Sequence, residues 1–212
     1  MKILALSCSP SRGRNSDTML DNFILGMREV KGIEIEKIYL EDIPIDLYRF
    51  ENSDGPRDHE VEFGKLGQKI SNEISGLVIS TPTYNFSVPA HLKNFIDRSR
   101  YFALDFSKKN KLGQPVGKLG HLKTYFLISG GTPNWAEKIL FFTFPAFWLR
   151  GVFLYFDAKV MGALYSGDIK TYQNQKILQK CFKRGKKYAI DVLYRKKQGI
   201  LENIFFRPPQ VK

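Results

Sequence analysis

Three short segments carry the side chains best suited to hold an anionic or planar ligand. The first, residues 7–16, reads Ser-Cys-Ser-Pro-Ser-Arg-Gly-Arg-Asn-Ser and precedes a predicted helix. Hydroxyl, amide and guanidinium donors beside the positive end of a helix dipole favour a phosphate group. The residues predicted to contribute are Ser9, Ser11, Arg12, Asn15 and Ser16. An alternative stays open, in which this segment is a polar turn and Asn15 or Ser16 only caps the helix.

The second and third segments suit a flat ring. Residues 81–89 read Thr-Pro-Thr-Tyr-Asn-Phe-Ser-Val-Pro, where two prolines stiffen the loop and aromatic residues flank one amide. Residues 129–133 read Ser-Gly-Gly-Thr-Pro, and adjacent glycines let the backbone approach a ligand closely. The residues predicted to contribute are Pro82, Thr83, Tyr84, Asn85, Phe86, Ser129, Gly130 and Gly131. The alternatives are a tight turn with two core aromatic residues and a plain strand-to-helix turn.

Strands and helices alternate along the chain and position these segments. Apolar runs and period-two alternation predict five strands, at residues 3–7, 33–40, 76–81, 124–129 and 158–164. Helical spacing of apolar residues predicts helices at 16–30, 61–74, after Pro89, at 135–153 and at 171–196. Residues 41–60 and 108–120 are predicted to be loops.

This alternation predicts an α/β fold, with one parallel sheet covered by helices on both faces. Such sheets bind ligands beyond the carboxyl ends of their strands, where the strand order reverses. The three polar segments follow the first, third and fourth strands, so we expect them to meet at that edge. Residues 1–212 are predicted to form a single domain, with a C-terminal tail at about 197–212.

The first two segments resemble a known family. Ser9-Pro10 with Asn15-Ser16, and the run from Pro82 to Arg98, are similar to NAD(P)H-dependent FMN reductases and quinone or azo reductases. The order of elements matches over about residues 1–195. The resemblance implies a flavodoxin-like three-layer sandwich with strand order 2-1-3-4-5 and bound FMN. It also implies NADH or NADPH as the donor and hydride transfer through the flavin to a quinone, free flavin or similar small acceptor.

The family also implies roles for individual residues. Ser9, Asn15 and Ser16 would hold the FMN phosphate, whereas the second and third segments would hold the isoalloxazine ring. Ser11 stands where related loops often carry a basic residue, so Arg12 or Arg14 is expected to supply that charge. No catalytic side chain is required, because the flavin carries the chemistry. No metal-ligand pattern is present in the sequence, and no metal is predicted.

Two other functions stay open. Cys8 and Arg14 have the Cys-x5-Arg spacing of low-molecular-weight phosphatases, in which a cysteine thiolate attacks the phosphate. Pro10 removes one backbone donor from such a loop, and the chain contains no Asp-Pro pair for the general acid. The second alternative is a flavodoxin that only carries electrons, although its docking rim would favour acidic residues and this chain has a net charge of +12.

Composition limits the partners and the compartment. Two cysteines far apart in sequence indicate a reducing compartment, and the short apolar N-terminus is predicted to be a strand rather than a signal peptide, so we expect a cytoplasmic protein. The basic charge has no base-reading module beside it, so nucleic acid is not expected. The apolar stretch 139–156 is interrupted by Pro145, Arg150 and Gly151, which disfavours a membrane span. Contact with a membrane surface is left open and is not predicted.

Aromatic residues crowd the same stretch and predict self-association. A contiguous exposed apolar patch usually marks an interface, and a symmetric dimer is the commonest closed assembly. We therefore expect a homodimer formed through this stretch, the alternative being that it folds over its own sheet. The aromatic residues concerned are Phe141, Phe142, Phe144, Phe147, Trp148, Phe153, Tyr155 and Phe156.

Overall fold

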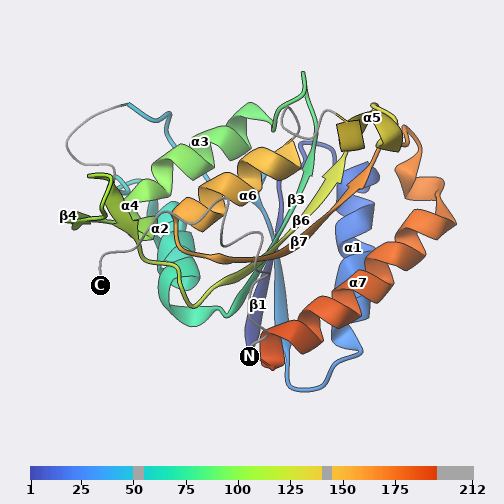
Figure 1. The fold of residues 1–212 in the computed structure, drawn as a ribbon, viewed down its shortest axis with the longest axis horizontal. Coiled ribbons are helices and arrows are strands. Elements are labelled where there is room, and N and C mark those ends of the chain that lie inside the picture. The colour runs from blue at the N-terminus through green and yellow to red at the C-terminus, as the bar shows by residue number, and fades with distance from the viewer. Residues whose placement is uncertain (50–54, 140–144, 195–212) are drawn as a thin grey trace.

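A computed structural model describes residues 1–49, 55–139 and 145–194 of the chain (Figure 1). Its centre is a five-stranded parallel sheet with strand order β2-β1-β3-β6-β7. The strands are β1 (Lys2–Ser7), β2 (Glu34–Tyr39), β3 (Gly76–Pro82), β6 (Lys123–Ser129) and β7 (Lys159–Ser166). This is the predicted order 2-1-3-4-5, because the labels β4 and β5 belong to a separate hairpin. The predicted flavodoxin-like arrangement is confirmed.

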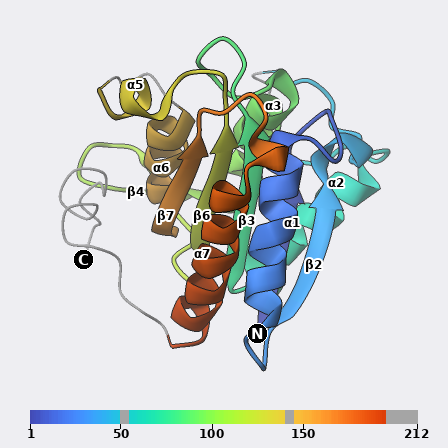
Figure 2. The same cartoon turned by 90° about the vertical axis from the view of Figure 1, so that its right-hand side faces the viewer.

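Helices cover both faces of the sheet (Figures 1 and 2). One face carries α1 (Asn15–Arg28) and α7 (Gln175–Leu193), and their apolar side chains form one buried cluster with the sheet. The other face carries α2 (Val61–Gln68), α3 (Ala90–Arg98) and α6 (Pro145–Tyr155), which form a second cluster. Because both faces are covered, β3 and β6 are almost wholly buried, as their continuous apolar runs predict.

Two glycines let α1 and α7 pack closely. A Cβ atom at Gly26 would lie 1.9 Å from the carbonyl oxygen of Phe182, and one at Gly185 would lie 2.0 Å from that of Phe23. Any larger residue at either position would push the helices apart. The pair of helices therefore forms a rigid layer over β1, β3 and β6.

The predicted loop at residues 108–120 contains part of a small antiparallel hairpin, which the sequence did not predict. Its strands are β4 (Leu104–Lys109) and β5 (Pro115–Gly117). The buried Asn110 organises the turn, since its side-chain oxygen accepts the N–H groups of Leu112 (2.9 Å) and Gln114 (3.0 Å). The signal was missed because the apolar alternation in these short strands is limited to Leu104 and Phe106.

Two predicted helices have different limits in the structure. In place of one helix at 135–153, the chain forms α5 (Asn134–Ile139) and then α6, which begins at Pro145, a residue suited to a first helical turn. In place of one helix at 171–196, a single 3₁₀ turn at Thr171–Gln173 precedes α7. Asn174 caps α7, its side-chain oxygen accepting the N–H of Ile177 at 3.3 Å. The predicted tail at 197–212 lies outside the described residues.

A buried ion pair fixes the predicted loop at residues 41–60, whose described parts flank residues 50–54. Arg98 of α3 contacts Glu60 at 2.6 Å, and both side chains are almost completely buried. Glu60 also accepts the backbone N–H groups of Asp46 (2.7 Å) and Arg57 (2.8 Å). Burial opposes ionisation of Glu60, but these bonds outweigh it and hold its pKa below the usual value. The remaining short elements are η1 (Leu40–Asp42), a π-helical turn (Lys69–Glu73) and α4 (Arg100–Ala103).

The aromatic stretch predicted to form a dimer interface packs partly on its own sheet. Phe153 and Phe156 are buried in the second core cluster, and Trp148 and Tyr155 pack against it while partly exposed. Residues 140–144, which include Phe141, Phe142 and Phe144, lie outside the described part of the chain. Of the helices that the structure describes, none has the length and apolar character needed to cross a bilayer.

Candidate functional site

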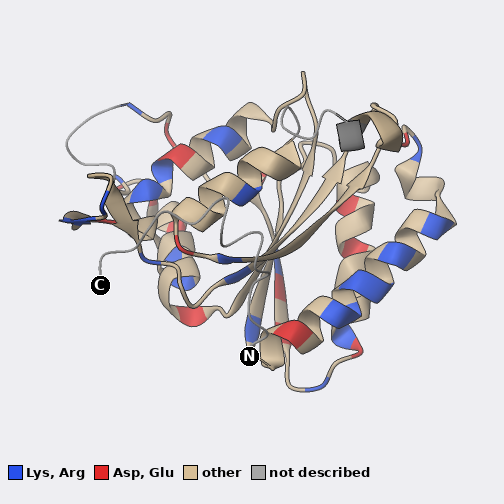
Figure 3. Cartoon of the chain, in the orientation of Figure 1, with Lys and Arg blue, Asp and Glu red and all other residues tan. Residues whose placement is uncertain are grey.

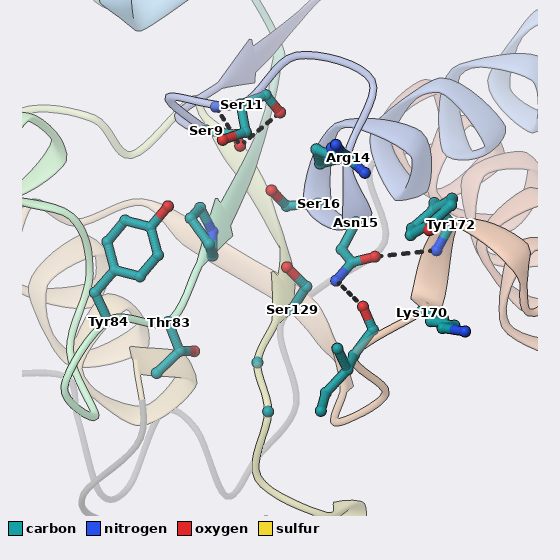
Figure 4. Close-up of a pocket in the computed structure, with 14 residues that line it drawn as sticks. Ser9, Ser11, Arg14, Asn15, Ser16, Thr83, Tyr84, Ser129, Lys170 and Tyr172 are labelled. Carbon is teal, nitrogen blue, oxygen red and sulfur yellow. Dashed lines mark hydrogen bonds between the residues drawn. The ribbon is translucent and has the colours of Figure 1, made fainter.

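The three segments predicted to bind a ligand do meet at the carboxyl edge of the sheet, around one pocket of about 510 Å³ (Figure 4). This volume is within the range typical of small-molecule sites. The residues that line it are Ser9, Ser11, Arg14, Asn15, Ser16, Pro82, Thr83, Tyr84, Ser129, Gly130, Gly131, Ile169, Lys170 and Tyr172. The predicted residues Arg12, Asn85 and Phe86 are not among them.

A buried carboxylate shapes the first loop. Asp17 accepts hydrogen bonds from the N–H of Gly13 (2.7 Å) and the hydroxyl of Ser7 (2.9 Å), and Lys37 lies 2.8 Å away. Gly13 has φ = +69°, a conformation that a glycine adopts without strain. Burial disfavours the charged form of Asp17, but the Gly13 and Lys37 contacts prevail and lower its pKa. The loop is therefore held in place before any ligand enters.

The first turn of α1 faces the pocket with an unpaired hydroxyl. Ser16 is 1% exposed, and its Oγ has no hydrogen-bond partner among the described residues. Arg14, at the N-cap position, makes no side-chain capping bond. Figure 4 shows the Ser16 side chain in the middle of the site, between Tyr84 on one side and Tyr172 on the other. The alternative in which Ser16 caps its own helix is therefore wrong for this conformation.

Asn15 uses its side chain to hold another loop. Its Nδ2 donates to the carbonyl oxygen of Ile169 at 2.9 Å, and its Oδ1 accepts the N–H of Tyr172 at 3.1 Å (Figure 4). Both functional groups of the amide are thus occupied by residues that follow β7. This also removes the capping alternative for Asn15, whose side chain positions the loop after β7, and its predicted contact with a phosphate stays a prediction.

The two arginines of the first loop point to different places. Arg12 pairs with Asp42, and its guanidinium lies 4.1 Å from the centre of the Tyr39 ring, on the side of β2. Arg14 lines the pocket, with its guanidinium 5.9 Å from the centre of the Tyr172 ring. Of the two arginines expected to supply a charge to the site, Arg14 is the one that lies there.

The second loop is a tight turn that projects from the end of β3. Tyr84 and Ser87 exchange two backbone hydrogen bonds of 2.9 Å, and the residues between them, Asn85 and Phe86, have φ values of +50° and +62°. Such a conformation is uncommon for a bulky residue such as phenylalanine, and strain of this kind gathers at functional sites. At the base of the loop, the Oγ1 of Thr83 is buried and has no partner in the described structure.

The third loop contains two glycines whose surroundings differ. A Cβ atom at Gly130 would lie 2.6 Å from the hydroxyl of Tyr165, whereas one at Gly131 would meet nothing within 4 Å. The N–H of Gly130 donates to the carbonyl oxygen of Ser166 at 2.9 Å. Gly130 is therefore needed for packing, whereas Gly131 leaves open space beside the pocket.

A fourth segment, which sequence reasoning missed, completes the lining. Ile169, Lys170 and Tyr172 follow β7, whose carboxyl end lies at the same sheet edge. Besides the Asn15 contacts, the N–H of Gly167 donates to the side-chain oxygen of Asn134 at 2.9 Å. The signal available was the predicted fifth strand, because its following loop had to emerge at this edge.

Cys8 does not have the environment of a catalytic nucleophile. Its side chain is completely buried outside the pocket lining, and burial raises the pKa of its thiol well above the usual value. His91 contacts the Cys8 backbone oxygen, not its thiol, at 3.1 Å, and burial lowers the pKa of His91. A reactive thiolate needs an electropositive, accessible setting. The phosphatase alternative is therefore not supported.

Comparison with known proteins agrees with this arrangement. The family model described as NADPH-dependent FMN reductase matches residues 1–130, which contain the first two pocket loops and the start of the third. The chain belongs to this family. Among curated FMN reductase relatives, the FMN-dependent NADH:quinone oxidoreductase of Mycoplasma mobile is 32% identical over 108 residues, covering 47% of this chain and 48% of that protein. The chain thus matches about half the length of that relative. The protein of the same name from Mycoplasma pneumoniae is 30% identical over 135 residues, covering 62% and 67%.

Solved structures share the fold of this FMN reductase family member. An FMN-dependent NADH-azoreductase from Bacillus anthracis, in complex with FMN, aligns with a TM-score of 0.66 at 16% identity, over 90% of this chain and 98% of that one. An NAD(P)H:quinone oxidoreductase from Methanothermobacter marburgensis aligns with a TM-score of 0.64 at 18% identity, over 89% and 97%. At these sequence identities, the two comparisons show a shared fold and nothing further.

Proposed function

We propose that this chain is an FMN-dependent oxidoreductase that takes electrons from NADH or NADPH and delivers them to a quinone, a free flavin or a similar small acceptor. The observation that carries the proposal is a pair of buried hydroxyls, Ser16 Oγ and Thr83 Oγ1, that have no partner in the described structure and belong to pocket residues. Buried polar atoms are normally hydrogen-bonded, so both indicate a polar ligand. The matched family and the names of its relatives point to FMN as that ligand.

The arrangement supports a division of the pocket into two ends. Ser16, Arg14 and the first N–H groups of α1 would hold the phosphate, because each provides a donor or a positive charge. Ser9 would lie beside them, with its hydroxyl bonded to the Ser11 backbone in the structure. At the other end, the ring would lie against Pro82, Thr83 and Tyr84 on one side. Ser129, Gly130 and Gly131 would approach it from the other side. Asn85 and Phe86 stand at the rim, and Arg12 and Asn15 support the loops.

When bound, FMN supplies two-electron transfer between a reduced nicotinamide and an acceptor. The residues of this chain contribute placement and charge. Arg14 and Lys170 bring positive charge to the pocket, and the helix α1 dipole adds to it, which favours an anionic cofactor. No described residue accepts a hydrogen bond from the N–H of Gly131, so that donor is available to a ring carbonyl. The open side of the pocket would admit donor and acceptor in turn.

The visible spectrum of the purified protein, followed by an activity assay, tests the proposal. We expect bound flavin with its two absorption bands, and NAD(P)H oxidation that depends on an added quinone. The Cys8→Ser variant is the control, because its thiol is buried away from the pocket and should leave the rate nearly unchanged. Failure of the protein to retain added FMN would refute the proposal. Flavin binding without quinone-dependent NAD(P)H oxidation would favour an electron carrier.

We also propose a homodimer, as the aromatic stretch 139–156 predicts, in which the open side of the pocket takes part in the contact. Support comes from large apolar side chains exposed on the second loop, on α5 and on the loop after β7, which are Tyr84 (47%), Phe86 (60%), Trp135 (67%) and Ile169 (75%). An exposed apolar group of this kind favours an interface. Light scattering should give a dimer mass, and Trp135→Glu should lower both that mass and flavin retention. A monomer mass for the unaltered chain would contradict this.

The remaining expectations are proposals of the same kind. We propose one domain over residues 1–212, supported by a single sheet that receives all five major strands. We propose a cytoplasmic location, supported by two buried free cysteines, Cys8 and Cys181, that belong to core clusters on opposite faces of the sheet. Fractionation of cells that express a tagged chain would test the location.

A further inference from the structure

Lysine and arginine residues are concentrated along α7 (Figure 3). Six cations lie on this helix and all are exposed, whereas Asp191, in its last turns, is its one acidic residue. None of the six forms an ion pair with an acidic side chain among the described residues. The six are Lys176, Lys180, Lys183, Arg184, Lys186 and Lys187. Their six positive charges equal half of the chain's net charge of +12.

The helix period places four of these lysines in one row. Positions 176, 180, 183 and 187 follow one another at spacings of four, three and four, which keeps them on one face of a helix. The buried residues of α7 lie on the opposite face, against α1 and the sheet. The row is about 16 Å long at 1.5 Å per residue. Because α1 and α7 pack through Gly26 and Gly185, the row is mounted on a rigid support.

The same row continues into exposed apolar residues. Ile190 and Tyr194 extend the spacing by three and four, and they are 40% and 78% exposed. Lysines followed by an aliphatic and a tyrosine side chain match a lipid interface, where cations meet anionic headgroups and tyrosine sits at the headgroup level. A nucleic acid would instead favour a groove or several aromatic platforms beside the cations. We name the six positions 176, 180, 183, 187, 190 and 194 the α7 stripe.

We propose that the α7 stripe docks this protein on an anionic lipid bilayer as a peripheral protein. The helix stays packed on its own sheet, because its apolar face is already buried, so contact is made by the stripe alone. The inference goes beyond the proposed oxidoreductase function and does not depend on it, although a membrane position would bring the enzyme near lipid-dissolved acceptors such as quinones.

Vesicle co-sedimentation of the full chain, loaded with FMN, tests this docking. Vesicles of phosphatidylcholine alone are compared with vesicles that also contain phosphatidylglycerol, at low and at high salt. Each lysine near an anionic surface strengthens binding about fivefold, so the triple variant K180Q/K183Q/K187Q should bind about a hundredfold more weakly. The variant I190S/Y194S should bind several-fold more weakly at every salt concentration, because its loss is not electrostatic.

A matched control removes three positive charges elsewhere. The variant K108Q/K109Q/K111Q changes exposed lysines of the β4–β5 hairpin and should keep nearly full binding. Equal binding to neutral and anionic vesicles, or no binding to either at low salt, would overturn the proposal. So would an equal loss in the control variant, or tighter binding to polyuridylate RNA than to the anionic vesicles. NAD(P)H oxidation without vesicles reports on the pocket separately.

Discussion

Replacing Ser16 by alanine should change the stability of the FMN-free protein and the affinity for FMN in opposite directions. The Ser16 hydroxyl is buried and has no partner among the described residues. A buried unsatisfied hydroxyl costs about 1–3 kcal/mol of desolvation free energy. Ser16→Ala removes that cost, so we expect the FMN-free protein to gain about 1 kcal/mol, which corresponds to a rise in Tm of roughly 2–4 °C for a chain of this size.

The affinity for FMN should fall in the same variant. If Ser16 donates to the phosphate, the lost charge-assisted hydrogen bond amounts to about 1.5–3 kcal/mol, or roughly a 10- to 150-fold rise in Kd. Riboflavin lacks the phosphate, so its Kd should stay unchanged. Quenching of flavin fluorescence measures both dissociation constants, and thermal unfolding without flavin measures the stability.

Ser99→Ala is the matched control for this experiment. Ser99 is also buried, but its hydroxyl donates to the carbonyl oxygen of Phe95 at 2.7 Å and it lies outside the pocket lining. It should lose about 1 kcal/mol of stability and keep its FMN affinity. A Ser16→Ala protein with an unchanged ratio of FMN to riboflavin affinity would show that the phosphate lies elsewhere.

Three further outcomes are expected. Asn15→Ala releases the loop after β7, so it should weaken FMN and riboflavin equally, by about fivefold, and speed proteolysis within that loop; a loss confined to FMN would make Asn15 a phosphate ligand instead. Gly130→Ala should lower Tm because its Cβ meets the Tyr165 hydroxyl, and adding Tyr165→Phe should restore part of the loss; additive losses would refute that contact. Because the pKa of Glu60 is lowered in the folded state, its ion pair stabilises the fold fully above the ordinary glutamate pKa, and this contribution disappears as pH falls through the lower, folded-state pKa. Glu60→Gln should therefore cost about 3–5 kcal/mol at neutral pH in urea unfolding and flatten the acid limb of the stability curve; a curve parallel to that of the unaltered chain would contradict this.

Local patterns in the sequence were sufficient to predict the central strands of the sheet and the loops that follow them. Continuous apolar runs at residues 76–81 and 124–129 predicted buried parallel strands, and both form the centre of the sheet. Proline and glycine marked the ends of these strands, because each restricts or frees the backbone wherever it occurs. The carboxyl ends of parallel strands meet at one edge, so the loops that begin at Ser7, Thr81 and Ser129 had to converge.

Tertiary contacts decided which side chains face the pocket. The sequence could not distinguish Arg12 from Arg14, since the choice depends on Asp42 and Tyr39, which lie about 30 residues away. It assigned Asn15 to the phosphate, whereas the structure engages both ends of that amide with the loop after β7.

The same reason explains the missed segment around Lys170. Periodicity records which face of an element is apolar, but the direction of a polar side chain depends on partners from distant parts of the chain. Those partners, such as the Ile169 carbonyl for Asn15 or the Asn134 side chain for Gly167, are set only when the sheet assembles. The sequence thus determined where the site forms, and the folded structure determined which of its donors remain free for a ligand.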